Sequence, residues 1–362
     1  MDVSQIESLD VNELNQTLIR LGAKFDKFAT DLANGSIKEL APPFADYYSY
    51  KGSIISYYRL FFEKYLRHLD DIDENTWKFV NISMTAYIKK YSENHITVGF
   101  DLKSECKRLM NSILNSVSEY YNGAPNKAFE SLRNCFINNN GHLLNLIPQI
   151  QYKGNLYRVR NKANLKDNKE LFHTPFELRT KCGSYRFSIL GYPSLYLSLS
   201  LGTSLKETDI NSENYTACRF YPQEILQCVD LALPSVELTF WERYSFVLFY
   251  PLIMACGLKV KIKEDSFKPE YIIPQLLFQV VTQHSDLAGI SYTSTRYDDP
   301  NFKDMQQRNF VMIIRNTVAD QGYSKELGKL FNMTDTTSPQ SGETSISVEH
   351  RLKKMEHKSL NI

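Results

Sequence analysis

Three residues with reactive side chains, Arg186, Tyr196 and Glu207, stand ten and eleven residues apart in the stretch GSYRFSILGYPSLYLSLSLGTSLKE (183–207). A guanidinium group binds phosphate oxygens in a planar fork that lysine cannot reproduce. A fixed carboxylate can stabilise positive charge that develops in a transition state. The three side chains can therefore form one active site, or they can be a surface charge, a packing residue and a helix cap.

The same stretch is predicted to form a strand, a turn, a second strand and the start of a helix. Between residues 195 and 201, four leucines alternate with Tyr196 and two serines. Alternate residues of a strand share one face, so the leucines belong to a core and Tyr196 faces a polar environment. Arg186 and Ser188 share a face in the same way. If the two strands pair, both polar faces can line one cleft.

Glu207 also has a purely structural interpretation. Ser204 and Glu207 fit the S-x-x-E pattern of a capping box at the start of a helix. The two interpretations are compatible, because a glutamate in a first helical turn can still face a pocket. From the pattern alone, Arg186 as a surface charge and Tyr196 as a half-buried packing residue also stay open.

Composition limits the class of protein. A chain of 362 residues is long enough for two domains, and 43% hydrophobic with 23% charged residues is ordinary for a globular protein. A net charge of +1 argues against a nucleic-acid-binding face. The six cysteines form no CxxC pair and no histidine spacing suits a metal, so we expect no metal site.

The N-terminus does not resemble a signal peptide. The longest apolar run (246–258) contains Pro251 and is too short to span a bilayer. We therefore expect a cytoplasmic protein with no membrane partner.

The pattern of the sequence changes near residue 150. Residues 1–145 are predicted to form an all-α domain, because apolar residues recur every three or four positions, and residues 137–142 are a plausible edge of it. Residues 150–320 are predicted to form an α+β domain, with strands at 155–160, 227–233 and 309–315, a strand and loop at 288–295, and a buried helix that opens at Pro274. The polar residues 333–362 are predicted to be a disordered tail that can end in a short basic helix.

Three stretches then add a resemblance to a known family: LYRVR (156–160), RFSILGYPSLYLSLSLGTSLKE (186–207) and DLAGISYTSTR (286–296). Their order and spacing resemble the RES domain, a bacterial family named for its arginine, glutamate and serine. Its members include toxins of Xre–RES toxin–antitoxin pairs that degrade NAD. The resemblance implies a mixed α/β domain similar to ADP-ribosyltransferases, with NAD in a cleft between sheets, and it leaves the N-terminal helices unexplained.

The resemblance also implies the site residues. In chain order, the family's two arginines, tyrosine, glutamate and serine fall on Arg158, Arg186, Tyr196, Glu207 and Ser294. It implies catalytic roles for Arg186, Glu207 and Ser294, and substrate binding by Arg158 and Tyr196; we assign Tyr157, next to Arg158, to substrate binding as well. NAD is then a substrate that is consumed, and no cofactor is expected. Phe187–Ile189 depart from the WN type of sequence of shorter members, which affects the expected recognition of ribose.

The function implied by the resemblance is cleavage of the nicotinamide–ribose bond of NAD, with water or phosphate as acceptor, in a bacterial toxin or anti-phage defence effector. The alternatives are a mono-ADP-ribosyltransferase that modifies a macromolecule and a nucleotide-sensing protein without catalysis. The N-terminal helices can restrain the toxin, sense a trigger or mediate assembly. A separate antitoxin and a homo-oligomer are the protein partners left open.

Overall fold

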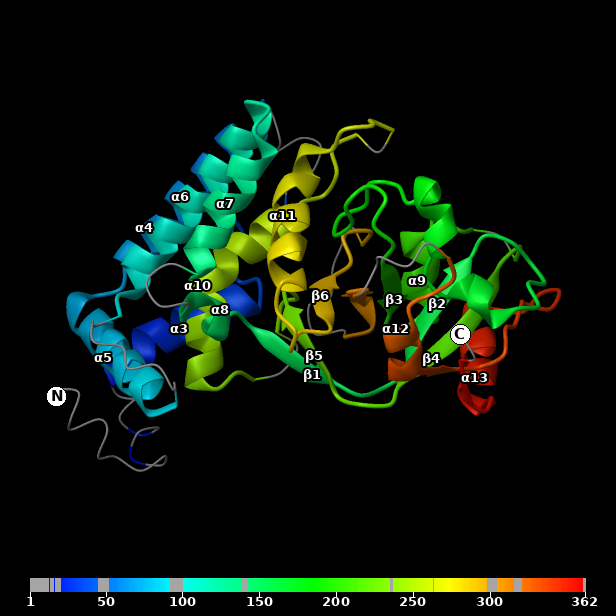
Figure 1. The fold of residues 1–362 in the computed structure, drawn as a ribbon. Coiled ribbons are helices and arrows are strands. Elements are labelled where there is room, and N and C mark those ends of the chain that lie inside the picture. The colour runs from blue at the N-terminus through cyan, green and yellow to red at the C-terminus, as the bar shows by residue number, and fades with distance from the viewer. Residues whose placement is uncertain are drawn as a thin grey trace. The chain divides into compact units, whose positions relative to one another are not determined.

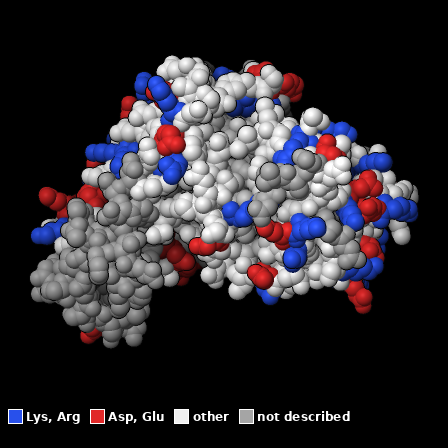
Figure 2. All heavy atoms as spheres, viewed as in Figure 1, with Lys and Arg blue, Asp and Glu red and all other residues white. Residues whose placement is uncertain are grey.

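The computed structural model describes residues 13, 16, 21–44, 52–91, 100–137, 142–211, 213–234, 237–262, 264–297, 305–315 and 321–360. The chain divides into two units (Figure 1): unit 1 contains residues 1–148 and 236–273, and unit 2 contains 149–235 and 274–362. Most of the predicted domain edge at 137–142 lies outside the described residues. On the face drawn in Figure 2, acidic and basic side chains are interspersed, in keeping with the net charge of +1.

Unit 1 is helical in its described part. Ser53 and Asp101 act as N-caps and accept hydrogen bonds from the backbone N–H groups of Ser56 and Ser104, as short polar side chains do at helix starts. Its helices are α3 (Ala23–Ala33), α4 (Ile54–Asp70), α5 (Glu74–Tyr91), α6 (Leu102–Tyr121), α7 (Pro125–Ile137), α8 (His142–Leu146), α10 (Phe240–Cys256) and the short 3₁₀ helix η3 (Pro269–Tyr271).

Helix α10 belongs to unit 1, although its residues lie within the segment that we predicted to be the C-terminal domain. It is apolar on almost every face and is buried from Phe246 to Cys256. Such a helix needs neighbours on all sides. It packs against α3 and α6, and the Tyr65 ring of α4 stacks on Tyr250 at 5.7 Å. The structure therefore moves residues 236–273 out of the predicted C-terminal domain.

Unit 2 contains a nine-stranded mixed sheet among its described residues. The strands are β1 (Gln149–Tyr152), β2 (Leu156–Arg160), β3 (Leu195–Ser198), β4 (Thr216–Pro222), β5 (Leu226–Asp230), β6 (Gly289–Thr293), β7 (Arg308–Met312), β8 (Phe331–Met333) and β9 (Lys358–Ser359). Their order is β1-β5-β6-β7-β3-β2-β4-β8-β9; β5 and β6 are parallel, and the other neighbours are antiparallel. The prediction of an α+β fold with an N-terminal helical region is confirmed.

Each face of the sheet has its own core. On one face, Leu195 and Leu197 pack with Phe310 and Met312. On the other face, Tyr157 packs with residues of α9 (Leu201–Glu207) and α13 (Ser345–Lys354). The remaining helical segments are α11 (Ile272–Thr282), which begins in unit 1, α12 (Lys325–Leu330), and the 3₁₀ helices η1 (Asn168–Leu171), η2 (Phe176–Lys181) and η4 (Met305–Gln307).

The C-terminal segment differs from the predicted disordered tail. Strands β8 and β9 extend the sheet, and α13 covers part of it. Val348 and Leu352, one helical turn apart, are both fully buried, and Arg351 forms an ion pair with Glu343 at 2.6 Å. The prediction was wrong because it relied on the polar composition of the segment. Two apolar residues one turn apart are enough to anchor a short amphipathic helix, and they change the composition very little.

No helix in the described part of the chain is both long enough and apolar enough to cross a membrane.

Candidate functional site

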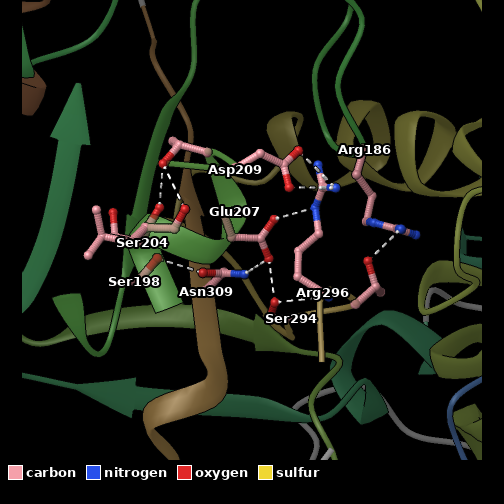
Figure 3. Close-up of polar contacts among 11 residues, drawn as sticks. Arg186, Ser198, Ser204, Glu207, Asp209, Ser294, Arg296 and Asn309 are labelled. Carbon is pink, nitrogen blue, oxygen red and sulfur yellow. Dashed lines mark hydrogen bonds and ion pairs between the residues drawn. The ribbon is translucent and has the colours of Figure 1, made fainter. Parts of the chain in front are cut away.

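The Glu207 carboxylate is the centre of a network of polar contacts in unit 2 (Figure 3). Its Oε1 atom accepts a hydrogen bond from Ser294 Oγ at 2.6 Å and another from Asn309 Nδ2 at 2.6 Å. Its Oε2 atom lies 3.7 Å from Arg296 Nε. The Glu207 side chain is 28% exposed, whereas Ser294 and Asn309 are buried. The two buried donors therefore fix a carboxylate that solvent and small molecules can reach.

Strand register brings the donors to Glu207. Ser198 on β3 lies opposite Asn309 on β7, and Tyr292 on β6 lies opposite Asn309 from the other side. Ser198 Oγ donates to Asn309 Oδ1 at 2.7 Å, which leaves the amide nitrogen for Glu207. Ser294 follows the end of β6, and its backbone N–H donates to the Gln307 carbonyl at 2.8 Å. Three neighbouring strands thus orient the groups that hold the carboxylate.

Helix α9 starts earlier than the capping-box interpretation required. Its N-cap is Ser200, which has an extended backbone and accepts a hydrogen bond from Thr203 N at 3.1 Å. Ser204 is a buried residue inside the helix, and Glu207 is the last residue of the helix. The Ser204–Glu207 capping box is therefore wrong, and Glu207 projects from the C-terminal end of α9.

Arg186 lies in a tight turn, not in the predicted strand. Tyr185 and Ser188 form an isolated bridge around the turn. Arg186 is only 6% exposed, so the surface-charge interpretation does not hold. Its Nη2 donates to Thr295 Oγ1 at 3.1 Å. Because Thr295 directly follows Ser294, Arg186 and Glu207 contact adjacent residues of one loop (Figure 3).

The Tyr196 side chain holds the turn that carries Arg186. Its hydroxyl group shares a 2.6 Å hydrogen bond with Ser188 Oγ and accepts another from Phe187 N at 3.2 Å. Its ring also meets Tyr185 edge-on, with centroids 6.1 Å apart. These side-chain contacts therefore give Tyr196 a structural role in holding the turn.

Arg158 occupies the place where β2 and β3 diverge, since the two strands share a single register pair, Tyr157 with Ser198. Arg158 Nη1 donates to the Tyr196 carbonyl at 2.8 Å, and its buried Nε has no hydrogen-bond partner among the described residues. Burial, followed by the charge of Arg160, lowers the pKa of Arg158 to about 9, so the guanidinium stays charged at neutral pH.

Arg160 is a second basic residue on the same face of β2, two positions from Arg158. Its Nε donates to the Glu170 carbonyl at 3.1 Å. Within the described residues, neither arginine forms an ion pair with a carboxylate. Two neighbouring guanidinium groups without a counter-ion favour the binding of an anionic group. We did not single out Arg160 from the sequence, although its i+2 spacing from Arg158 was visible there.

Tyr157 is not in a position to bind substrate. It is 1% exposed and packs in the core beneath α9 and α13. Neighbouring residues of a strand point to opposite faces, so Arg158 does not enter the core that encloses Tyr157. The assignment of Tyr157 to substrate binding is therefore contradicted by its position.

Sequence reasoning missed Asn309 and Arg296. Asn309 was part of a predicted strand, and a polar residue in an otherwise apolar run was its only signal. Arg296 stands two residues after Ser294; its guanidinium lies 3.3 Å from Asp209 Oδ2 and 3.7 Å from Glu207 Oε2. The described residues contain no group of three or more His, Cys, Asp or Glu side chains that could hold a metal ion.

His173 is a structural residue. Its Nδ1 is 2.7 Å from the Thr174 carbonyl, and its Nε2 accepts a hydrogen bond from Ser324 N at 2.8 Å. This arrangement requires the neutral ring with the proton on Nδ1. Burial lowers the pKa of His173 to about 4, more than the Thr174 hydrogen bond raises it. The histidine therefore joins two segments of the chain.

The fold and the site define an α+β protein in which hydroxyl and amide donors hold one accessible carboxylate near a buried arginine. No family model matches the chain, and no solved structure matches it. The chain is similar to a protein of Bacillus subtilis (strain 168) named "Putative toxin YopC", with 29% identity over 295 residues. The match covers 74% of this chain and 65% of that protein, so the chain spans about two thirds of the relative's length. The RES resemblance stays a prediction.

Proposed function

We propose that this protein is a toxin that consumes NAD by cleaving the bond between nicotinamide and ribose. The observation that supports the proposal most directly is the Glu207 carboxylate, fixed by Ser294 and Asn309 and still 28% exposed. The name of the Bacillus subtilis relative supports the toxin role. The predicted RES resemblance supplies NAD as the substrate.

The chemistry requires a carboxylate at the sugar. Nicotinamide leaves as a neutral molecule, while positive charge develops on the ribose, as in glycoside hydrolysis. Glu207 would accept hydrogen bonds from the ribose hydroxyls and stabilise that charge. The 3.7 Å separation from Arg296 Nε is longer than a hydrogen bond, so Oε2 can still accept one from a substrate hydroxyl. Ser294 and Asn309 would keep the carboxylate in place and avoid the cost of reorienting it during the reaction.

The phosphate groups of NAD require positive charge. Arg186 and Arg158 are the residues we propose for the pyrophosphate, with Arg160 as a neighbour that adds to the positive potential. Arg158 suits this role because its Nε has no partner among the described residues and no carboxylate neutralises its charge there. A phosphate group between the strands would provide the missing acceptor.

The test is to incubate the purified protein with NAD, with and without phosphate, and to identify the products. Glu207→Gln keeps the shape and removes the charge, and we expect it to lower turnover by about 100-fold or more. Glu224→Gln, on an exposed turn of the same unit, is the matched control and should leave turnover unchanged. Near-normal turnover by Glu207→Gln would refute the proposed role of the carboxylate.

The products also separate the alternatives. Free ADP-ribose indicates water as acceptor, and its 1″-phosphate indicates phosphate. Label from NAD on protein or nucleic acid would instead show an ADP-ribosyltransferase, and NAD binding without release of nicotinamide would show a sensor. Expression in bacteria tests the toxin role: the wild type should stop growth and Glu207→Gln should not.

A further inference from the structure

A carboxylate from the C-terminal segment contacts the first turn of α9. Glu349 lies on α13, and its Oε2 accepts a hydrogen bond from the backbone N–H of Leu201 at 2.9 Å. Its Oε1 lies 2.9 Å from Lys353 Nζ. The Glu349 side chain is 16% exposed, so solvent competes little for this contact. The two partners are 148 positions apart in the sequence.

The contact satisfies a group that the helix itself cannot satisfy. The first backbone N–H groups of a helix have no partner within it. Ser200 accepts from Thr203 N, and Glu349 accepts from Leu201 N, so two different side chains cap the start of α9. A negative charge at this end also complements the helix dipole.

Apolar packing supports the same contact. Val348 and Leu352 of α13 are completely buried in one cluster with Leu201 of α9. Helix α9 has seven residues, and Glu207 is the last of them. At about 1.5 Å per residue, Leu201 and Glu207 are about 9 Å apart along the helix axis. If the first turn of α9 tilts or frays, the Glu207 carboxylate will therefore move relative to Ser294 and Asn309, and its hydrogen bonds to them will weaken.

We propose that Glu349, on α13, is a positioning residue for Glu207. The inference rests on the proposed function in one respect: the positioned group is the one that acts on the substrate. The hydrogen bond from Leu201 holds the start of α9, and the helix transmits that constraint to the carboxylate at its other end.

Three full-length variants test the inference by kinetics. Glu349→Ala removes the acceptor, and we expect kcat for NAD to fall about 10-fold with KM changed less than about twofold, because the misplaced carboxylate affects the transition state. Glu349→Gln keeps an oxygen that can accept from Leu201 N and should restore at least half of the wild-type kcat. Lys354→Ala, at an exposed position of the same helix, is the matched control and should be close to wild type. Equal kcat for Glu349→Ala and the wild type would overturn the proposal.

A double variant shows whether Glu349 acts through Glu207. In the Glu207→Gln background, the further change Glu349→Ala should lower kcat by less than about twofold, because residues that act as a unit are not additive. A full 10-fold further loss would show that Glu349 acts elsewhere, and would overturn the positioning role.

Hydrogen exchange gives a readout that does not require activity. Peptides covering residues 199–208 should exchange at least about 10-fold faster in Glu349→Ala than in the wild type or Glu349→Gln, because an unsatisfied helix start opens locally. Peptides from β1 and β5 should exchange at unchanged rates in all three proteins. If the wild type does not consume NAD, the proposed function fails, and the exchange of residues 199–208 still decides the positioning role. Unchanged exchange there in Glu349→Ala would overturn it.

Discussion

The two units bury different kinds of side chain. In the described part of unit 1, the buried polar residues are Thr and Ser hydroxyls and one carboxylate, Glu270. Unit 2 buries guanidinium, imidazole and amide groups in addition to hydroxyls: Arg186, Arg219, Arg308, His173, Gln307 and Asn309. Burying such groups costs free energy unless each is hydrogen-bonded. Unit 2 therefore holds the buried polar groups of the candidate site, while apolar packing dominates unit 1.

The difference predicts where substitutions act. Aromatic rings fill the core of unit 1, as in the stacking of Phe136 on Phe249 with centroids 6.2 Å apart. Changes there should reduce stability and leave chemistry intact. Changes to Arg186 and Asn309, the buried polar groups at the candidate site in unit 2, should reduce activity by more than they reduce stability, whereas a change to His173 should act on stability. The four predictions below test this distinction, in order of decreasing effect.

The largest effect is expected from Phe249→Ala. This residue is fully buried in α10, and removing its ring leaves a cavity, so the free energy of unfolding of unit 1 should fall by about 3–5 kcal/mol. Both tryptophans of the chain, Trp77 and Trp241, lie in unit 1, so tryptophan fluorescence in urea reports on this unit. NAD turnover per folded molecule should stay within twofold of the wild type.

Leu60→Ala is the control for Phe249→Ala, because Leu60 is 52% exposed on α4 of the same unit. It should change the free energy of unfolding by less than about 1 kcal/mol. A loss of NAD turnover in Phe249→Ala under native conditions would show that the two units are energetically coupled, and would break the distinction.

Asn309→Leu should have the second largest effect. The change nearly conserves the shape of the side chain. It removes the amide N–H that donates to Glu207 and the amide oxygen that accepts from Ser198. We expect kcat for NAD to fall about 100-fold, or about 2.7 kcal/mol, while the melting temperature changes little more than for Ser198→Ala. If the variant instead has a much lower melting temperature and its folded fraction keeps the wild-type kcat, Asn309 is a structural residue.

The titration of His173 should contribute to the pH dependence of the free energy of unfolding. Its folded pKa is lowered to about 4, below the unfolded value, so the unfolded state binds the extra proton. The stability that it contributes at neutral pH is lost as pH falls from 6.5 towards 4, by about 1.6 kcal/mol between pH 6.5 and 5. The side chain of His173→Gln cannot titrate, so its free energy of unfolding, measured in urea, should fall less over this pH interval than that of the wild type, by this amount. An equal fall in both proteins would contradict the prediction.

The smallest effect is expected from Arg186→Lys, which keeps the positive charge but loses the planar fork. We expect KM for NAD to rise about 10-fold, or 1.4 kcal/mol, with the melting temperature within a few degrees of the wild type. Arg351→Lys, in an ion pair on α13 away from the carboxylate, should leave KM unchanged. An unchanged KM in Arg186→Lys would remove Arg186 from the substrate-binding residues.

Part of the fold could be predicted from local patterns. The strands predicted at 155–160, 195–200 and 309–315 correspond to β2 (Leu156–Arg160), β3 (Leu195–Ser198) and β7 (Arg308–Met312), although the last prediction extends three residues too far. The pattern failed at Arg186, because a tight turn and a short strand have the same alternation over four residues. It failed also at 333–362, where polar composition concealed the buried residues Val348 and Leu352.

The candidate site was predictable only as a set of residue types. The resemblance selected Glu207 and Ser294, and the structure brings them to 2.6 Å. The pattern offered no reason to select Asn309 or Glu349, which contact Glu207 and Leu201 across 102 and 148 positions of sequence. Such pairs depend on the register of strands and the packing of helices, which local patterns do not encode.

The sequence alone determined strands such as β2 and β3, the helical character of the N-terminal region, and which side chains were able to do chemistry, because periodicity and residue type are local properties. Only the tertiary structure decided that Glu207 ends α9, that Tyr157 points away from Arg158's face, and that α10 belongs to unit 1. The physical reason is that these positions depend on contacts between residues far apart in the sequence. Glu207 is held by Ser294 and Asn309, and the apolar helix α10 is covered by helices from the N-terminal part of the chain.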